Sequence, residues 1–218
     1  MITLGHGPLS DGIVVVRGLG AAEAPEIVAA ATPGEATCFA PEAAPFTLEQ
    51  VLTWVRGWEE GRRRRRSAAF AALDAATGDL LGGLVLQVGV PYRQHDLPWR
   101  GEYVEHPADA LPDVVRVAPP AWLVELRELM PDVAEVAYWV RRSARGRGIA
   151  TCALRLLSDW ALDDGGLAAL WAEIGSANPA SARVAATAGY RLAGPLPRVS
   201  IEPDTTAREH DLVSVWSR

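Results

Sequence analysis

The sequence predicts an α/β (α+β) protein in which helices cover the faces of one mixed sheet. Apolar segments typical of strands interleave with segments of helical periodicity, in the order β-α-α-β-β-β-α-β-α-β-β. The 218 residues suit a single domain, 1–218, and 49% hydrophobic with 22% charged residues suits a folded chain. A segment without such periodicity, at about 90–132, is predicted to be a long insertion before the central strand.

The first half begins with one strand and two helices. Val and Ile predict the strand at Gly12–Arg17, and an Ala- and Glu-rich stretch predicts a helix at about Ala21–Ala31, which Thr32-Pro33-Gly34 would end. Pro41–Pro45 is predicted to be a loop. The second helix starts at Thr47-Leu48-Glu49-Gln50, because a Thr followed three residues later by Gln is a capping box.

Five consecutive arginines, Arg62–Arg66, end this second helix. One interpretation is a contact with phosphates or nucleic acid. The other is a solvated helix end whose cations complement the negative C-terminus of the helix. The second interpretation is favoured, because the run is isolated in a protein with a net charge of −6.

A hairpin follows the arginines. Strands are predicted at Ser67–Leu73 and Leu80–Val88, with a polar turn at 74–78 between them. Gly82 and Gly83 lie inside the second strand and indicate a bulge or a close backbone approach.

The insertion at 90–132 is rich in proline and acidic, and it is predicted to hold one short helix at about Ala121–Met130. It carries eight acidic residues (Asp96, Glu102, Glu105, Asp109, Asp113, Glu125, Glu128, Asp132) against four arginines (Arg93, Arg100, Arg116, Arg127). Either it forms part of a site that favours a cationic substrate, or it is a solvated surface loop.

The second half alternates strands and helices. Val133–Val140 is predicted to be the central strand, and the helix after it carries a buried face from Ile149 to Trp160. Asp163-Asp164-Gly165-Gly166 would stop this helix before a strand at Leu167–Ile174. Asn178 as N-cap with Pro179 at the first helical position predicts another helix.

Three further features complete the second half. Gly189 would end the last helix, and the final strands are predicted at Tyr190–Ala193 and Asp211–Trp216.

The connection Arg145-Gly146-Arg147-Gly148-Ile149-Ala150 has the chemistry of a diphosphate cradle. Its two glycines allow a tight turn and a close approach of a ligand to the backbone. The first amides of the following helix have no partner inside the helix, so they favour anionic oxygens, and two arginines add positive charge. The alternative is a simple connection between a strand and a helix.

Composition excludes several function classes. All 21 basic residues are Arg, so chemistry that needs a lysine, such as a Schiff base, is excluded. The acidic balance argues against a general nucleic-acid binder. Cys38 and Cys152 are far apart, and the four histidines lack ligand spacing, so no metal site is expected. We expect no membrane span and, by default, a cytoplasmic protein.

The segment 133–192 resembles the GNAT N-acetyltransferases, and within them the subgroup of the ribosomal-protein-alanine N-acetyltransferases. The signature Arg/Gln-x-x-Gly-x-Gly/Ala is present as 145–150, Asn-x-x-Ser as 178–181, and Ala-Gly-Phe as Ala188-Gly189-Tyr190. The three motifs stand in the family's order, whereas the long insertion departs from the family's usual short connection.

The resemblance implies a GNAT-like, mostly antiparallel sheet and acetyl transfer from acetyl-CoA, as co-substrate, to an amine, without a metal. It implies that backbone groups of Trp139, Val140 and Arg141 pair with pantetheine and that Arg145–Ala150 hold the pyrophosphate. Asn178 would touch the pantetheine or acyl region; plain helix capping is the alternative, and the two are compatible.

The implied chemistry needs a base and an acid. A carboxylate should accept the proton of the amine, with Glu135 the first choice and Glu173 the second; each could instead be an exposed strand carboxylate or a salt-bridge partner. A backbone amide near Val140 could polarise the carbonyl. Ser181 or Tyr190 could protonate the thiolate, with a core aromatic as the alternative for the tyrosine.

The motifs do not identify the acceptor, which could be a protein N-terminus, a polyamine or a small-molecule amine. A non-catalytic acyl-CoA binder or sensor is the alternative function, and a nucleic-acid-associated protein that uses Arg62–Arg66 ranks third. A homodimer is left open.

Overall fold

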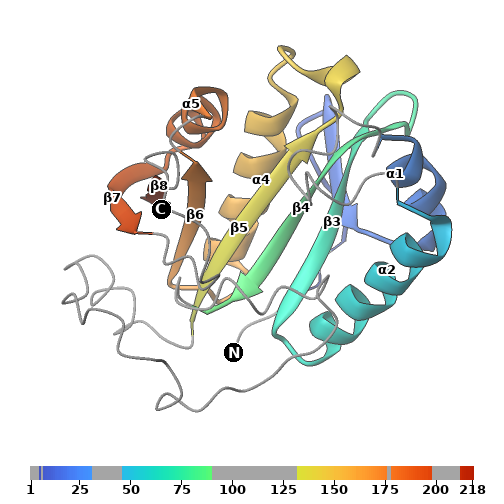
Figure 1. Ribbon diagram of the computed structural model, residues 1–218, viewed down its shortest axis with the longest axis horizontal. Coiled ribbons are helices and arrows are strands. Elements are labelled where there is room, and N and C mark those ends of the chain that lie inside the picture. Colours follow the sequence, from blue (N-terminus) through green and yellow to red (C-terminus); the bar gives the residue numbers. More distant parts are fainter. Residues whose placement is uncertain (1–4, 6, 31–45, 90–131, 176–177, 198–211) are drawn as a thin grey trace, which may run out of the picture.

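The computed structural model describes residues 5, 7–30, 46–89, 132–175, 178–197 and 212–218, which form one eight-stranded sheet flanked by helices (Figure 1). The strand order is β1-β2-β3-β4-β5-β6-β8-β7. The strands are β1 (Leu9–Ser10), β2 (Val14–Gly18), β3 (Ser67–Asp74), β4 (Leu80–Val88), β5 (Val133–Val140), β6 (Ala169–Gly175), β7 (Arg191–Pro197) and β8 (Leu212–Ser217). The helices are η1 (Ala21–Glu23), α1 (Ala24–Ala30), α2 (Leu48–Arg63), η3 (Arg142–Ala144), α4 (Ile149–Asp163) and α5 (Pro179–Thr187).

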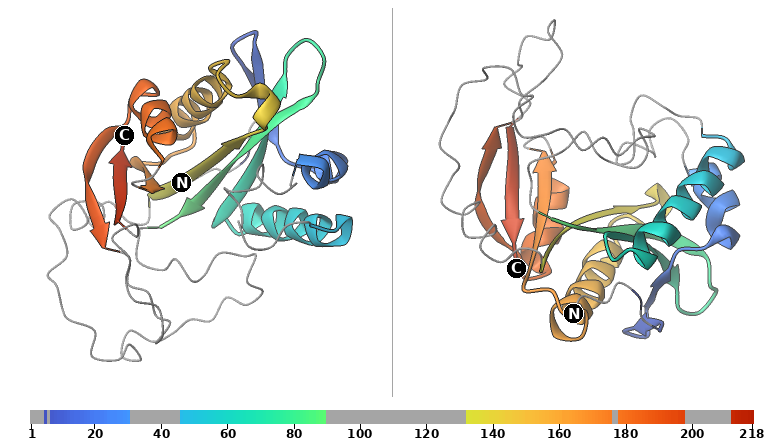
Figure 2. Two further views of the ribbon diagram at one scale, coloured as in Figure 1. Left: turned by 45° about the horizontal axis from the view of Figure 1, so that its top comes forward. Right: turned by 90° about the horizontal axis from the view of Figure 1, so that it is seen from below.

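The predicted fold class is confirmed. All neighbouring strands are antiparallel except the central pair β5 and β6, which is parallel. Helices α1 and α2 lie on one face of the sheet, and α4 and α5 lie on the other (Figure 2). The capping box at the start of α2 forms as expected, because the Gln50 amide donates to Thr47 Oγ1 and the Thr47 amide donates to Gln50 Oε1.

The side chains of β5 alternate between the two faces of the sheet. Its even-numbered residues join the core that α4 and α5 cover, where Ala134 and Val136 are buried. The odd-numbered residues face the side of α1 and α2, where Trp139 packs against Leu73 and Leu80. The alternation places Glu135 on this second face.

Both glycines of β4 are required by close contacts with β5. A Cβ atom at Gly82 would lie 2.2 Å from the carbonyl oxygen of Trp139, and one at Gly83 would lie 2.6 Å from the Trp139 indole nitrogen. The register between β3 and β4 also shifts beside Gly82, at Ala72/Leu73. The expected bulge and the expected close approach are therefore both present.

The parallel pair β5–β6 is paired over only three residues on each strand. The register runs from Val133↔Ala169 to Glu135↔Trp171, although β5 continues to Val140 and β6 to Gly175. Beyond this last pair the two strands diverge (Figure 1). The sheet is thus open between its two central strands, on the side where β5 leads into η3 and α4.

Some boundaries differ from those expected. The two-residue strand β1 is too short to show a pattern and was not predicted, and β7 extends to Pro197 rather than Ala193. Prolines are tolerated there because β7 is an edge strand. The helix stop at 32–34, the loop at 41–45 and the helix and acidic cluster within 90–131 lie outside the described residues.

The arginine run is a helix end, as favoured above. Helix α2 stops at Arg63, and Arg64 caps it. Arg63 and Arg64 both form ion pairs with Glu60, at 2.8 and 2.7 Å. The chain turns at Arg65, which has a left-handed φ of 56°.

Candidate active site

The loop between η3 and α4 has the geometry of an anion-binding turn. Gly146 and Gly148 both have left-handed φ angles, 74° and 77°, which favour glycine. Open space surrounds both, since a Cβ atom at either position would meet nothing within 4 Å. Helix α4 starts at Ile149, and its first intrahelical donor is the amide of Cys152, which bonds to Gly148. The three preceding amides therefore point out of the helix start toward this open space.

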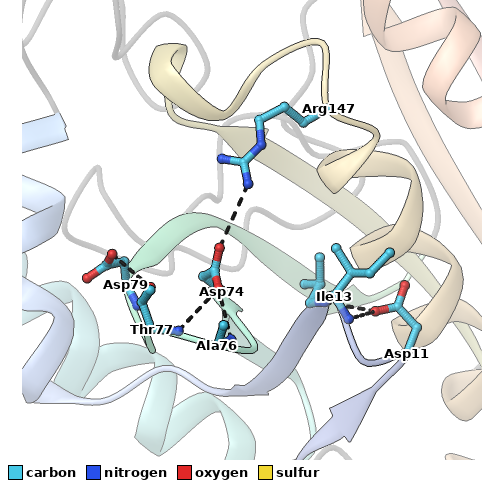
Figure 3. Close-up of polar contacts among 8 residues, drawn as sticks. Asp11, Ile13, Asp74, Ala76, Thr77, Asp79 and Arg147 are labelled. Atoms are coloured by element: carbon cyan, nitrogen blue, oxygen red, sulfur yellow. Dashed lines mark hydrogen bonds and ion pairs between the residues drawn. The ribbon is translucent and has the colours of Figure 1, made fainter.

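The two arginines of the loop are held by different partners. Arg145 Nε donates to the carbonyl oxygen of Val140 at 3.2 Å. Arg147 is 54% exposed, and its guanidinium lies 3.8 Å from the carboxylate of Asp74, at the tip of the β3–β4 hairpin (Figure 3). The other oxygen of Asp74 accepts from the amides of Ala76 and Thr77, so the carboxylate is fixed by its own turn.

Backbone bonds show which groups of β5 face the opening in the sheet. The Gly89 amide donates to Val133 at one end of β5, and the Arg141 amide donates to Leu81 at the other. Odd-numbered residues of β5 therefore bond to β4, and even-numbered residues direct their backbone groups toward β6. Of the three residues expected to pair with pantetheine, only Val140 faces the opening.

The side chains of Trp139 and Arg141 contact residues of β3, β4 and α1. The Arg141 guanidinium donates to the Glu26 carboxylate at 3.2 Å and to the Leu80 carbonyl at 3.1 Å. Glu26 also accepts from the Leu80 amide, so this ion pair joins α1 to the start of β4. Sequence reasoning gave no signal for this contact, because Glu26 and Arg141 are 115 positions apart.

Glu135 lies in the last paired row before the sheet opens. Its neighbours across the two ladders are Gln87 on β4 and Trp171 on β6. The Trp171 side chain is buried, and its indole nitrogen donates to the Gly89 carbonyl at 2.8 Å, so the ring is fixed beside this row. Burial of the carboxyl, and secondarily the negative charge of Glu173, raise the pKa of Glu135 from 4.5 to about 8.

The two carboxylates chosen from the sequence are thus close enough that the charge of Glu173 raises the pKa of Glu135. Glu173 is two residues beyond Trp171 on β6, so it lies on the same face of the sheet. A base with a pKa near the working pH is the kind that proton abstraction requires, and a pair of carboxyl groups is a common way to obtain it. The arrangement therefore suits Glu135 for accepting a proton.

Ser181 and Asn178 lie at the start of α5. Asn178 accepts from the Ser181 amide at 3.0 Å, so the capping role of Asn178 is present. The Ser181 hydroxyl donates to the hydroxyl of Tyr138 at 2.8 Å, and that hydroxyl in turn donates to the Ser181 carbonyl at 2.9 Å. Sequence reasoning missed Tyr138, although its even position on β5 predicts that it faces α4 and α5.

Tyr190 is in a different environment. It is 3% exposed, and its hydroxyl lies 2.8 Å from Ser158, which donates to the Leu154 carbonyl. Because the Ser158 proton is used in this way, the Tyr190 hydroxyl is the donor in the pair. Burial raises the pKa of Tyr190. This placement favours the core aromatic over the thiolate-protonating acid.

The chain is similar to known acetyltransferases in sequence motif and in fold. Residues 114–191 match the family described as "Acetyltransferase (GNAT) domain". This part of the chain therefore matches a GNAT acetyltransferase domain. The match includes β5, the anion-binding loop, α4, β6 and α5, and it confirms the resemblance and the acetyltransferase class expected from the motifs. No curated protein sequence matches the chain.

Solved structures share the fold over nearly the whole chain. One is RimL, a "Ribosomal L7/L12 alpha-N-protein acetyltransferase", in complex with coenzyme A, with a TM-score of 0.67, 15% identity, and coverage of 97% of this chain and 96% of that chain. Another is the ribosomal-protein-S5-alanine acetyltransferase of Vibrio fischeri, with a TM-score of 0.67, 14% identity, and coverage of 98% and 96%. A chimeric spermidine N-acetyltransferase from Vibrio cholerae has a TM-score of 0.60, 12% identity, and coverage of 94% and 93%.

The described residues show neither a membrane-spanning helix nor a cluster of metal ligands. Within the described ranges, no helix has the length and apolar character needed to cross a membrane. Nor does that part of the chain contain a group of three or more His, Cys, Asp or Glu side chains placed to hold a metal ion.

Proposed function

We propose that the protein transfers the acetyl group of acetyl-CoA directly to a primary amine, with Glu135 as the general base. One observation carries the proposal. The sheet opens at the row of Glu135, whose carboxyl has a pKa of about 8, and the open side of β5 ends at a loop built for anions. A long, phosphate-bearing thioester is the kind of substrate that needs both features.

The residues of the chain fit acetyl-CoA. The amides that follow Gly148, with Arg145 and Arg147, would hold the pyrophosphate by charge-assisted hydrogen bonds. The backbone of Val140 faces the opening and would pair with the pantetheine arm as an added strand does, and a backbone amide near it would polarise the thioester carbonyl. Glu135 would accept a proton from the amine, with Glu173 as the alternative base, and Ser181 would protonate the leaving thiolate.

The identity of the acceptor amine is supported less directly than the use of acetyl-CoA. Structures with this fold include acetyltransferases named for ribosomal proteins and for spermidine, so the fold does not select one amine. A cationic acceptor that contacts the acidic insertion remains a prediction. Neutralising Glu102, Glu105 and Asp109 together should raise the KM for the acceptor, and an unchanged KM would remove the idea. A homodimer and a cytoplasmic location also stay expectations.

Thermal unfolding with acetyl-CoA, CoA and ATP tests the first half of the proposal. A ligand at about 100 times its Kd, bound only to the folded state, adds about 2.7 kcal/mol, which raises the melting temperature measurably. Gly148→Glu should abolish the shift with acetyl-CoA and CoA, because it places a bulky anion in the cradle. Absence of any shift in the unsubstituted protein would refute the proposal.

Gly78→Glu is the matched control. Gly78 has a φ of 78°, against 77° at Gly148, and a Cβ atom at either glycine meets nothing within 4 Å. Both substitutions therefore cause the same backbone strain, about 1–2 kcal/mol, but only one lies in the cradle. Equal loss of the ligand-induced shift in both variants would show that strain, and not the cradle, is responsible.

A screen of amines with detection of released CoA tests the second half of the proposal, which is transfer of the acetyl group to an amine. Transfer that is lost in Glu135→Gln, while the acetyl-CoA shift remains, supports catalysis by Glu135. The alternative, a protein that binds acyl-CoA without catalysis, predicts the shift with no CoA release from any amine.

A further inference from the structure

Two Tyr–Ser hydroxyl pairs occur among the described residues, and they differ in where they lie. The pair of Tyr190 and Ser158 is inside the core, with 3% and 0% exposure. The pair of Tyr138 and Ser181 is only partly buried, and it joins β5 to the first turn of α5. Only the second pair is placed where a ligand could reach it.

Tyr138 lies on the open stretch of β5. The last residue of β5 that pairs with β6 is Glu135, so Tyr138 is three positions into the opening. Its side chain points to the face of α4 and α5, and α5 follows β6 in the chain. The hydrogen bonds with Ser181 therefore bridge the two sides of the opening at the place where the strands have already separated.

The hydroxyl protons of this pair form a directed chain. Ser181 Oγ donates to the Tyr138 oxygen at 2.8 Å, and the Tyr138 hydroxyl donates to the Ser181 carbonyl at 2.9 Å. Each hydroxyl has one proton and two acceptor lone pairs. If Ser181 turns its proton toward a third group, its oxygen can accept the proton of Tyr138 without any movement of the chain.

We propose that Tyr138 and Ser181 act together as a proton relay to the thiolate that leaves when the acetyl group is transferred. The inference rests on the acetyl transfer proposed above. As the C–N bond forms and the C–S bond breaks, the sulfur receives the proton of Ser181 Oγ, and Ser181 Oγ receives the proton of Tyr138. The resulting phenolate regains a proton from solvent, which balances the proton that the amine gave to Glu135.

The relay explains why a tyrosine stands behind the serine. An alcohol is a poor acid, and a phenol is a much better one, so negative charge left on Tyr138 costs less than charge left on Ser181. Tyr138 thus contributes through Ser181, as a positioning and proton-supplying residue.

Binding of coenzyme A with and without its sulfur tests the relay apart from turnover. We would measure the Kd of CoA and of desulfo-CoA between pH 7 and 9 by calorimetry. Hydrogen bonds to a thiolate should make the unsubstituted protein prefer CoA increasingly as pH rises. Tyr138→Phe keeps the ring and removes the hydroxyl, and it should reduce this preference at pH 9 about tenfold while the Kd of desulfo-CoA stays within about twofold.

Kinetics give a second readout. Tyr138→Phe and Ser181→Ala should each lower kcat about 10- to 100-fold with an unchanged KM for acetyl-CoA, and the double variant should be no slower than the slower single variant, because the two residues act as a unit. Ser158→Ala is the control from the buried pair, and it should lower stability and leave kcat unchanged. If Tyr138→Phe does not fold, Tyr138→Met removes the same hydroxyl and carries the same test.

The outcomes separate the two proposals. If the unsubstituted protein binds no CoA, the proposed function fails. If it binds CoA and transfers acetyl groups, but Tyr138→Phe retains the full preference for CoA over desulfo-CoA at pH 9, only the relay is overturned.

Discussion

Replacing Glu135 by Gln should change both the pH dependence of stability and the pH dependence of acetyl transfer. The pKa of Glu135 is about 8 in the folded protein, against 4.5 for an ordinary glutamate. Between these values the folded protein keeps a proton at Glu135 that the unfolded chain releases. The contribution of this proton to stability is therefore complete below pH 4.5 and is lost as pH rises to 8.

The size of the effect follows from the difference between the two pKa values. That difference is about 3.5, and 1.36 kcal/mol for each unit gives at most about 5 kcal/mol. Gln is neutral at all pH values and has nearly the shape of protonated Glu. The variant and the unsubstituted protein should thus have similar free energies of unfolding at pH 4.5, and the variant should become the more stable by up to about 5 kcal/mol at pH 8.

Urea unfolding of both proteins at pH 5, 6, 7 and 8 measures this difference. Subtracting the free energy of unfolding of the unsubstituted protein from that of the variant removes the contribution of all other titrating groups. In parallel, kcat/KM for the amine should rise with pH to an apparent pKa of about 8, and Glu135→Gln should lower kcat by about 10²–10⁴. Stability curves that run parallel from pH 5 to 8 would refute the raised pKa. Unimpaired transfer by the variant would refute the role of Glu135 as base.

Three further substitutions have defined outcomes. Glu173→Gln should move the rise in kcat/KM to lower pH, though not to 4.5, because burial is the larger cause of the raised pKa of Glu135; a pH profile that does not move contradicts the interaction. Asp74→Asn keeps the turn at 74–77 but removes the charge that competes with phosphate for Arg147, so titration calorimetry should show acetyl-CoA binding up to about fivefold tighter, and weaker binding would contradict this view. Arg65→Gly should raise the free energy of unfolding in urea by up to about 1 kcal/mol, because the left-handed φ of 56° is unfavourable for arginine; a loss of stability would mean that the arginine side chain matters more than its backbone.

Features governed by neighbouring residues were predictable from the sequence. The capping box at Thr47, the N-cap at Asn178 and the left-handed turn at Gly148 depend on contacts within a few positions, and all three are present. The strand order was less predictable from the sequence. The pairing of β6 with β8, the last strand, and the position of β7 at the sheet edge depend on segments far apart in the chain.

In the candidate site, too, local features were predictable from the sequence and contacts between distant segments were not. The left-handed geometry at Gly146 and Gly148 depends on the local sequence, so the tight turn could be predicted, whereas its role in binding acetyl-CoA stays a proposal. The family resemblance implied that backbone groups of Arg141 pair with pantetheine, but the Arg141 amide bonds to Leu81 and its side chain bonds to Glu26. A resemblance in local sequence gives no information about a partner 115 positions away.

The chemistry of the site is set by such distant partners. Glu135 is a plausible base in the sequence only because it stands on the right strand, whereas its pKa of about 8 requires burial and the charge of Glu173 on another strand. No role for Tyr138 could be predicted from the sequence, because its hydrogen-bond partner Ser181 on α5 is 43 positions away. Glu135 is in the last row that is paired between β5 and β6, and Tyr138 is three positions beyond it, so both residues lie beside the opening. The interruption of pairing between β5 and β6 therefore lies beside both the proposed base, Glu135, and the proposed proton relay of Tyr138 and Ser181.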